Sequence, residues 1–160
     1  MGEIKVKLKP HPVMPLQAFL RLLPALAALL LLAGCSRVLL EAAESGDLQA
    51  QYELGAAFAS GDGVPLNLQE AIHWYRQAAE KGHIAAQLNL GLAYSRGEGV
   101  AADPVEAVRW YRKAADQGDA DAQFNLAYAY SHGRGVSKDS LEAKKWLRKS
   151  EGRKEIEDPD

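Results

Sequence analysis

The sequence predicts an all-α fold, a solenoid in which helix-turn-helix repeats stack on one another. Three observations lead to this prediction. The same short motifs recur every 36 residues without slippage. Apolar residues within each repeat are spaced at three and four positions, as on one face of a helix. Capping residues and glycines stand where those helices should begin and end. We therefore expect about three repeats, preceded by an N-terminal half-repeat.

The repeat motif sets the expected domain organisation. AQYELG begins at residue 50, AQLNLG at residue 86 and AQFNLA at residue 122, and a Gly-x-Gly-Val loop follows each of them. A match of residues 42–46 to residues 78–82 adds half a repeat ahead of the first. The expected segments are an N-terminal half-repeat helix within 35–46, repeats at 47–82, 83–118 and 119–151, and a charged tail at 152–160.

The second helix of each repeat is predicted from an apolar stripe and from its capping residues. In the first repeat the stripe consists of Ala71, Trp74, Tyr75, Ala78 and Ala79. Asn67, Asp103 and Asp139 precede the three second helices, each with a glutamate three residues later. This spacing predicts capping boxes, which satisfy backbone N–H groups that have no helical partner. The tryptophans lie within the stripes, so we interpret them as packing residues rather than as a sugar-stacking ladder.

Glycines mark the predicted helix ends and one close contact. Gly46, Gly82 and Gly118 lie just past helix ends, where a left-handed backbone is favoured. The Gly-x-Gly loops are expected to supply positive φ angles for a turn, not to bind phosphate, because no strand precedes them and no Gly-Lys-Ser/Thr follows. Gly55 and Gly91, inside the first helices, are expected to let a neighbouring backbone approach.

The first helix of each repeat carries apolar residues on two sides. Leu54 and Phe58 are predicted to face the second helix, whereas Tyr52, Ala56 and Ala59 form a second stripe. A helix of this kind is either sandwiched between neighbours or presents one side to a ligand. The corresponding positions hold Leu88, Leu92 and Ser95 in the second repeat, and Phe124, Tyr128 and Ser131 in the third.

A chain that shows A-Q-x-x-L-G, G-x-G-V and A-x-x-W-Y-x-x-A-A every 36 residues resembles the Sel-1-like repeat family, relatives of the tetratricopeptide repeats. The resemblance spans roughly residues 42–151 and implies that the first helices line a concave groove for a peptide. It also implies that Asn89 and Asn125 hydrogen-bond the backbone of that peptide. The alternative is that Tyr52, Leu88 and Phe124 pack between successive first helices. The residues implied in protein or peptide binding are Tyr52, Leu88, Asn89, Leu92, Phe124, Asn125 and Tyr128.

The last second helix departs from this pattern. Leu147, Ser150 and Glu151 stand where earlier repeats have a tyrosine and two alanines. Lys144 and Lys145 replace the isoleucine and histidine of the first repeat. A more polar final helix is expected of the end cap of a solenoid, on which nothing stacks.

The N-terminal part of the chain predicts a lipoprotein signal peptide at residues 1–34. The apolar run 22–32 follows Arg21 and is too short to cross a bilayer. Residues 32–35 read LAGC, which resembles the bacterial lipobox. This resemblance implies cleavage before Cys35 and lipidation of its thiol. Met14 is an alternative start of the leader. The alternative interpretation is a short apolar helix in which Cys35 only fills space.

Composition and motifs argue against several function classes. The formal net charge is −2, and the chain after Cys35 is more acidic than the whole, so we expect no nucleic-acid partner. His73, His83 and His132 lack metal-ligand spacing, and neither a Gly-x-Ser-x-Gly nor a Ser-x-x-Lys motif is present. We therefore expect no catalytic residue, no metal and no cofactor.

These inferences converge on a non-catalytic protein–protein interaction module, a scaffold or assembly helper, anchored by lipid at the bacterial cell envelope. The expected partners are a protein or peptide of the envelope and, through the lipid, the membrane. By the sorting rule for bacterial lipoproteins, Ser36 favours the outer membrane over the inner one, with the chain facing the periplasm. The alternative is an envelope enzyme or a peptidoglycan-binding accessory protein. The oligomeric state stays open.

Overall fold

The computed structural model describes residues 37–152. The predicted signal peptide, the lipidation site Cys35 and residues 153–160 of the charged tail lie outside the described residues. Within the described range the chain is helical, with turns and loops between the helices and no strand. This confirms the predicted all-α class.

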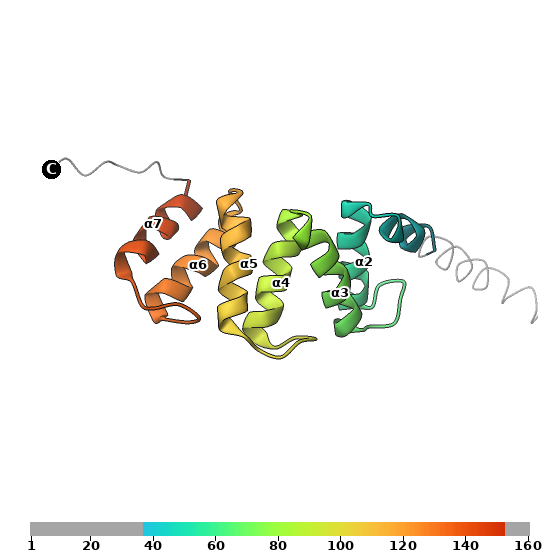
Figure 1. The fold of residues 1–160 in the computed structure, drawn as a ribbon, viewed down its shortest axis with the longest axis horizontal. Helices are drawn as coiled ribbons and strands as arrows, with labels where there is room; N and C mark the ends of the chain where they lie inside the picture. Colours follow the sequence, from blue (N-terminus) through green and yellow to red (C-terminus); the bar gives the residue numbers. More distant parts are fainter. Residues whose placement is uncertain (1–36, 153–160) are drawn as a thin grey trace, which may run out of the picture. The chain divides into compact units, whose positions relative to one another are not determined.

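The helices follow one another in antiparallel pairs (Figure 1). A helix over residues 37–44 precedes the others. It is followed by α2 (Leu48–Ser60), α3 (Leu68–Glu80), α4 (Ile84–Arg96), α5 (Pro104–Asp116), α6 (Ala120–His132) and α7 (Ser140–Ser150). From α2 to α7, each helix packs mainly against the helix before it and the helix after it. The predicted solenoid of helix-turn-helix repeats is thus confirmed, with α2/α3, α4/α5 and α6/α7 as the pairs.

A buried glutamine ties each first helix to the second helix of the repeat before it. The Nε2 groups of Gln51, Gln87 and Gln123 donate hydrogen bonds of 3.0, 3.0 and 3.1 Å to main-chain carbonyls. The acceptors are Ala43, Ala79 and Ala115, at the ends of the preceding second-type helices. All three glutamines are buried. The recurring Ala-Gln pair of the sequence therefore has a structural role that the pattern alone did not assign.

The predicted N-cap residues are confirmed, but the reciprocal bond to the glutamate of each capping box is not formed. Asn67, Asp103 and Asp139 are the N-caps of α3, α5 and α7, and their side chains accept from the backbone N–H groups two and three residues later. The backbone N–H of each cap residue, however, does not donate to the glutamate side chain, as a capping box requires. It donates instead to a carbonyl in the last turn of the preceding helix, at 2.8–2.9 Å. The prediction of complete capping boxes was wrong, because tertiary packing already supplies that acceptor.

The core is divided among the junctions between helices, where alanines let the helices approach closely. Leu54, Leu90 and Leu126, one from each first helix, are the largest fully buried side chains. Trp110 and Trp146 are buried as well, and Trp74 packs at the edge of the first junction. The tryptophans are therefore packing residues, as the stripe pattern predicted.

The second glycine of each later Gly-x-Gly loop touches the neighbouring repeat. Gly99 and Gly135 have φ angles of 71° and 73°, which confirms the predicted left-handed turns. A Cβ atom at Gly135 would also overlap the backbone of Pro104, at the start of α5, and one at Gly99 would overlap the backbone of Leu68, at the start of α3. These loops are contacts between successive repeats as well as turns.

We expect Gly135→Ala to lower the free energy of unfolding by about 1–3 kcal/mol more than Gly118→Ala does. Both glycines have a positive φ, so both variants carry the left-handed strain of about 1–2 kcal/mol. Nothing lies within 4 Å of a Cβ at Gly118, so this variant isolates the backbone strain. Urea denaturation followed by circular dichroism measures the difference. Equal losses in the two variants would contradict the inter-repeat contact.

Candidate protein-binding site

The second apolar stripe of the first helices packs between successive repeats along most of the stack. Tyr52 is half-buried against the cluster formed by α3 and α4. Leu88 and Leu92 are half-buried against the cluster formed by α5 and α6. Of the two interpretations left open by the sequence, packing therefore describes these three residues, and little of their surface is free for a ligand.

The two asparagines of the implied groove differ in their surroundings. The Asn89 amide hydrogen-bonds the hydroxyl of Tyr75, and burial raises the pKa of that hydroxyl above its usual value although this hydrogen bond partly opposes the shift. Asn89 is thus engaged within the stack. Asn125 is half-buried and lines a small cavity of about 40 Å³ together with Val108 and Tyr111 of α5. Both asparagines are half-buried, so their predicted contact with a peptide backbone stays a prediction.

The stripe becomes exposed only in the third repeat. Phe124 and Tyr128 of α6 are 55% and 44% exposed, because no further repeat follows among the described residues. The Tyr128 ring stacks on His132 with 4.1 Å between the ring centroids, which holds it in place. Two aromatic side chains are therefore presented together on one face of α6.

A pocket of about 340 Å³ opens beside these aromatics, between α6 and α7. Its lining is mostly apolar. The lining residues are Phe124, Ala127, Tyr128, Ser131, Ser140, Ala143, Lys144 and Leu147. Of the residues predicted to bind a partner, Phe124 and Tyr128 line this pocket, whereas Tyr52, Leu88, Asn89, Leu92 and Asn125 do not.

Two positions that line the pocket change together in the last repeat. In the second repeat a Cβ at Gly91 would lie only 2.6 Å from Cδ1 of the Tyr111 ring, so the glycine makes room for the tyrosine. Gly55 and Tyr75 repeat this contact in the first repeat. In the third repeat the pair is Ala127 and Leu147, and the shorter leucine leaves space unfilled.

This contact adds to an expectation from the sequence. Gly55 and Gly91 were expected to admit a neighbouring backbone, but their nearest neighbours are tyrosine rings. The carbonyl of Ala71 comes next, 3.2 Å from a Cβ at Gly55. A ring lying flat on a helix needs the same small residue that a close backbone does, so the sequence does not distinguish the two cases.

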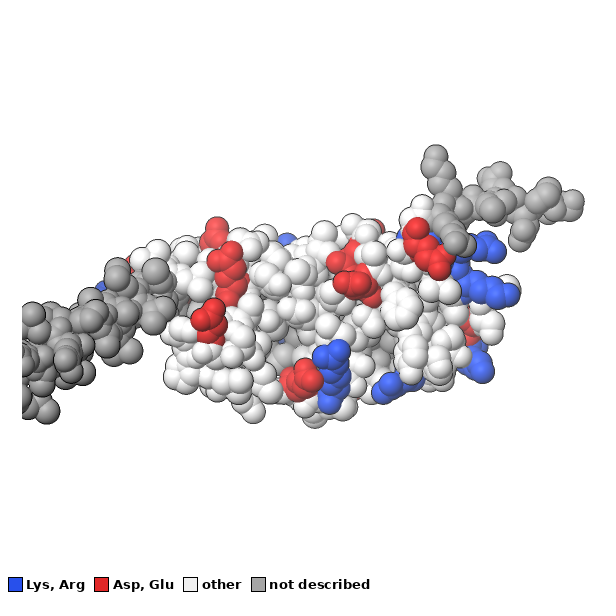
Figure 2. All heavy atoms as spheres, turned by 180° about the vertical axis from the view of Figure 1, so that it is seen from behind, with Lys and Arg blue, Asp and Glu red and all other residues white. Residues whose placement is uncertain are grey.

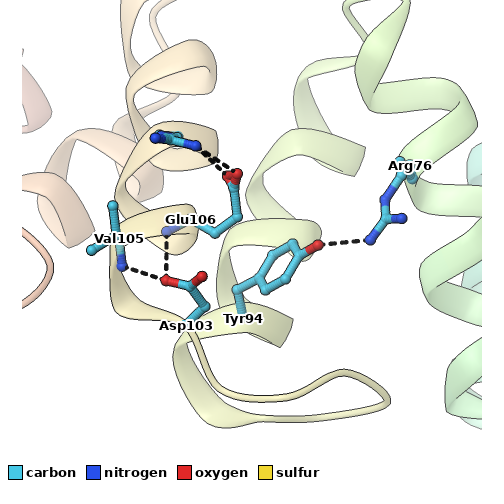
Figure 3. A network of polar contacts seen from close by, with 6 residues as sticks. Arg76, Tyr94, Asp103, Val105 and Glu106 are labelled. Atoms are coloured by element: carbon cyan, nitrogen blue, oxygen red, sulfur yellow. Dashed lines mark hydrogen bonds and ion pairs between the residues drawn. The ribbon is translucent and has the colours of Figure 1, made fainter.

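Arginine–tyrosine hydrogen bonds link neighbouring repeats. The Arg76 guanidinium, on α3, donates to the Tyr94 hydroxyl, on α4, at 2.7 Å (Figure 3). Arg112 and Tyr130 make the same bond between α5 and α6. Arg148 occupies the corresponding position on α7, where no later helix of the described residues supplies a tyrosine.

Basic residues gather at the end of the stack formed by α7 (Figure 2). They are Lys138, Lys144, Lys145, Arg148 and Lys149. Lys145 pairs with Glu142 at 3.6 Å, and the Lys149 ammonium lies 4.5 Å from the centroid of the Trp146 ring. Lys144 and Arg148 have no such partner among residues 37–152.

The described residues contain neither a metal centre nor a membrane span. No group of three or more His, Cys, Asp or Glu side chains in this range could hold a metal ion. No helix within residues 37–152 combines the length and the apolar character that crossing a bilayer requires. His83 caps α4: its Nδ1 accepts from the N–H of Ala86 at 3.2 Å. This histidine is therefore the N-cap of α4, the role that Asp47 and Asp119 have in α2 and α6.

The sequence pattern of the Sel1 repeat family matches residues 48–83, 84–119 and 120–150. A search of the curated proteins found no match. Among solved structures, the chain is similar to a Sel1 repeat protein from Oxalobacter formigenes, with 42% identity and a TM-score of 0.68 over 72% of this chain and 87% of that one.

Two further solved structures are similar. A protective antigen of uropathogenic Escherichia coli with an SLR fold is 41% identical, with a TM-score of 0.70, over 71% of this chain. The match covers only 24% of the antigen's own length. Cysteine-rich protein B of Helicobacter pylori is 24% identical with a TM-score of 0.57 over 74% of this chain and 85% of that one, and this likeness shows the fold alone.

We expect a double-mutant cycle at Gly91 and Tyr111 to show compensation. Gly91→Ala destabilises because its new methyl group meets the tyrosine ring, and Tyr111→Leu destabilises because it leaves a void. Together they recreate the pair found in the third repeat, so their combined loss should fall short of the sum by about 1–3 kcal/mol. Urea denaturation of the four proteins measures the coupling. Strict additivity would show that the two positions are independent.

Proposed function

The chain belongs to the Sel1 repeat family, and from that premise we propose that it is a lipid-anchored scaffold or assembly helper at the bacterial cell envelope. Proteins of this family are typically protein-interaction modules without catalytic activity. The finer parts of the proposal are the lipid on Cys35, the periplasmic location at the outer membrane, and a protein or peptide partner in the envelope.

The observation that carries the binding role is the open pocket with its two exposed aromatics. Phe124 and Tyr128 stand beside a pocket of about 340 Å³, which is within the range of ligand-binding clefts. Large aromatic side chains that enter a partner's pocket, or border their own, supply most of the energy of typical interfaces.

The support for an envelope location comes from the residues ahead of the repeats. An apolar run with a preceding arginine and a terminal Leu-Ala-Gly-Cys is the pattern of a lipoprotein leader. Several acyl chains on one cysteine would hold the protein firmly, since each buried CH₂ contributes about 0.8 kcal/mol. Residue 37, two positions after Cys35, is already helical, so the repeats would follow the anchor closely.

We expect Cys35→Ser to release the protein from the membrane fraction of bacteria that express it. The wild-type chain should incorporate labelled palmitate and sediment with membranes, and the variant should do neither, because serine offers no thiol to acylate. Cell fractionation with palmitate labelling measures both properties. An unlabelled wild-type chain, or a variant that still sediments, would contradict the lipid anchor.

We expect Phe124→Ala combined with Tyr128→Ala to lower partner capture at least tenfold in intact envelopes, because both rings line the pocket. A photo-crosslinker at the position of Ser131, which also lines the pocket, reports the capture. The matched control is Leu66→Ala combined with Val105→Ala, which removes two exposed apolar side chains elsewhere. Equal capture by the two double variants would contradict binding at this pocket.

A further inference from the structure

The stack itself shows what covers an internal repeat. The first helix α4 packs on α3, and α6 packs on α5. At the second of these junctions, residues of α6 leave a cavity of only about 40 Å³ against α4 and α5, whereas the corresponding place in the third repeat is a pocket of about 340 Å³. The open face of α6 and α7 therefore continues a series of helix-accepting surfaces.

The polar contacts of this face keep the same register. Arg76 and Arg112 each donate to a tyrosine hydroxyl of the following first helix. Arg148 stands 36 residues after Arg112, on the same side of α7, and has no partner within residues 37–152. A helix that covered the pocket in the register of the stack would bring an acceptor to this guanidinium.

The lysine at position 144 determines which side chains a helix bound to this face must carry. Lys144 occupies the position of Ile72 and Val108, which are 7% and 6% exposed beneath the next repeat. A helix that covered Lys144 would bury an ammonium group, and a buried charge without a partner is costly. The covering helix therefore needs a carboxylate at that point. A second copy that docked through the same face would instead bring Lys144 and Arg148 near their own like charges.

We propose that the open face of α6 and α7 binds an acidic amphipathic helix of a partner protein, in the register of the first helix of a fourth repeat. Its apolar side fills the pocket beside Phe124 and Tyr128. A glutamate or aspartate faces Lys144, and an oxygen acceptor faces Arg148. This inference rests on the proposed interaction function and names the class of partner.

The test uses a probe built from this chain. A fluorescent peptide of residues 120–132, the sequence of α6, is held helical by a staple joining the exposed positions 121 and 124. Asn125 of α6 and Val108 of α5 line the same small cavity, so residue 125 of a docked peptide should face Lys144. One peptide carries Asn125→Glu and its matched control carries Asn125→Lys. Fluorescence anisotropy measures their binding to the full chain in detergent micelles.

We expect the acidic peptide to bind at least tenfold more tightly than the basic one. Lys144→Glu in the protein should reverse this order, and Lys144→Val should remove the preference. Equal affinities for wild type, or an order that Lys144→Glu does not change, would overturn the proposal. Those results would leave the proposed function standing, provided that envelope crosslinking still depends on Phe124 and Tyr128.

Two other occupants have distinct outcomes in the same experiment. If Ile156→Ser in the C-terminal segment 153–160 raises the affinity for the acidic peptide tenfold, that segment covers the face in the wild-type chain. This result would overturn the proposal. If sedimentation shows that the wild-type chain self-associates and Phe124→Ala abolishes this, a second copy is the occupant. That outcome also overturns the proposal.

Discussion

At each junction between successive repeats, a buried glutamine side chain donates a hydrogen bond to a main-chain carbonyl of the preceding helix. Gln87 lies in a core of alanines, where an unpaired amide would cost roughly 1–3 kcal/mol, and the carbonyl of Ala79 is its acceptor. The bond joins each first helix to the helix before it at an equivalent point. The arginine–tyrosine bonds recur at the same junctions, between α3 and α4 and between α5 and α6.

Much of this architecture could be predicted from the sequence because the relevant signals are local. Helix starts are set by residues such as Asp103, whose side chain bonds groups two and three positions later. Turns are set by glycines whose φ angles are positive. The incomplete capping boxes could not be predicted, since the competing acceptor, the carbonyl of Tyr94, belongs to another helix and comes into reach only after folding.

The candidate site could be predicted only in part, for a related reason. A position on the helical wheel places Tyr52 and Phe124 on equivalent faces, yet one is half-buried and the other exposed. The difference arises because further repeats stack over Tyr52, whereas none among the described residues stacks over Phe124. The pocket is lined by a pair, Ala127 and Leu147, whose members are twenty positions apart and lie on two different helices. Each change is visible alone, but their joint effect on volume is a property of the packed structure.

Because each helix contacts mainly its neighbours, the stability of each helix depends on the helices directly before and after it. The last pair, α6 and α7, and the helix over residues 37–44 are each held from one side only among the described residues, so either end can open locally without disturbing the middle of the stack. A partner helix bound to α6 and α7 would supply the missing contacts and stabilise that end against local opening. Binding would then slow amide hydrogen exchange most in α7, and this slowing would decrease helix by helix toward α2.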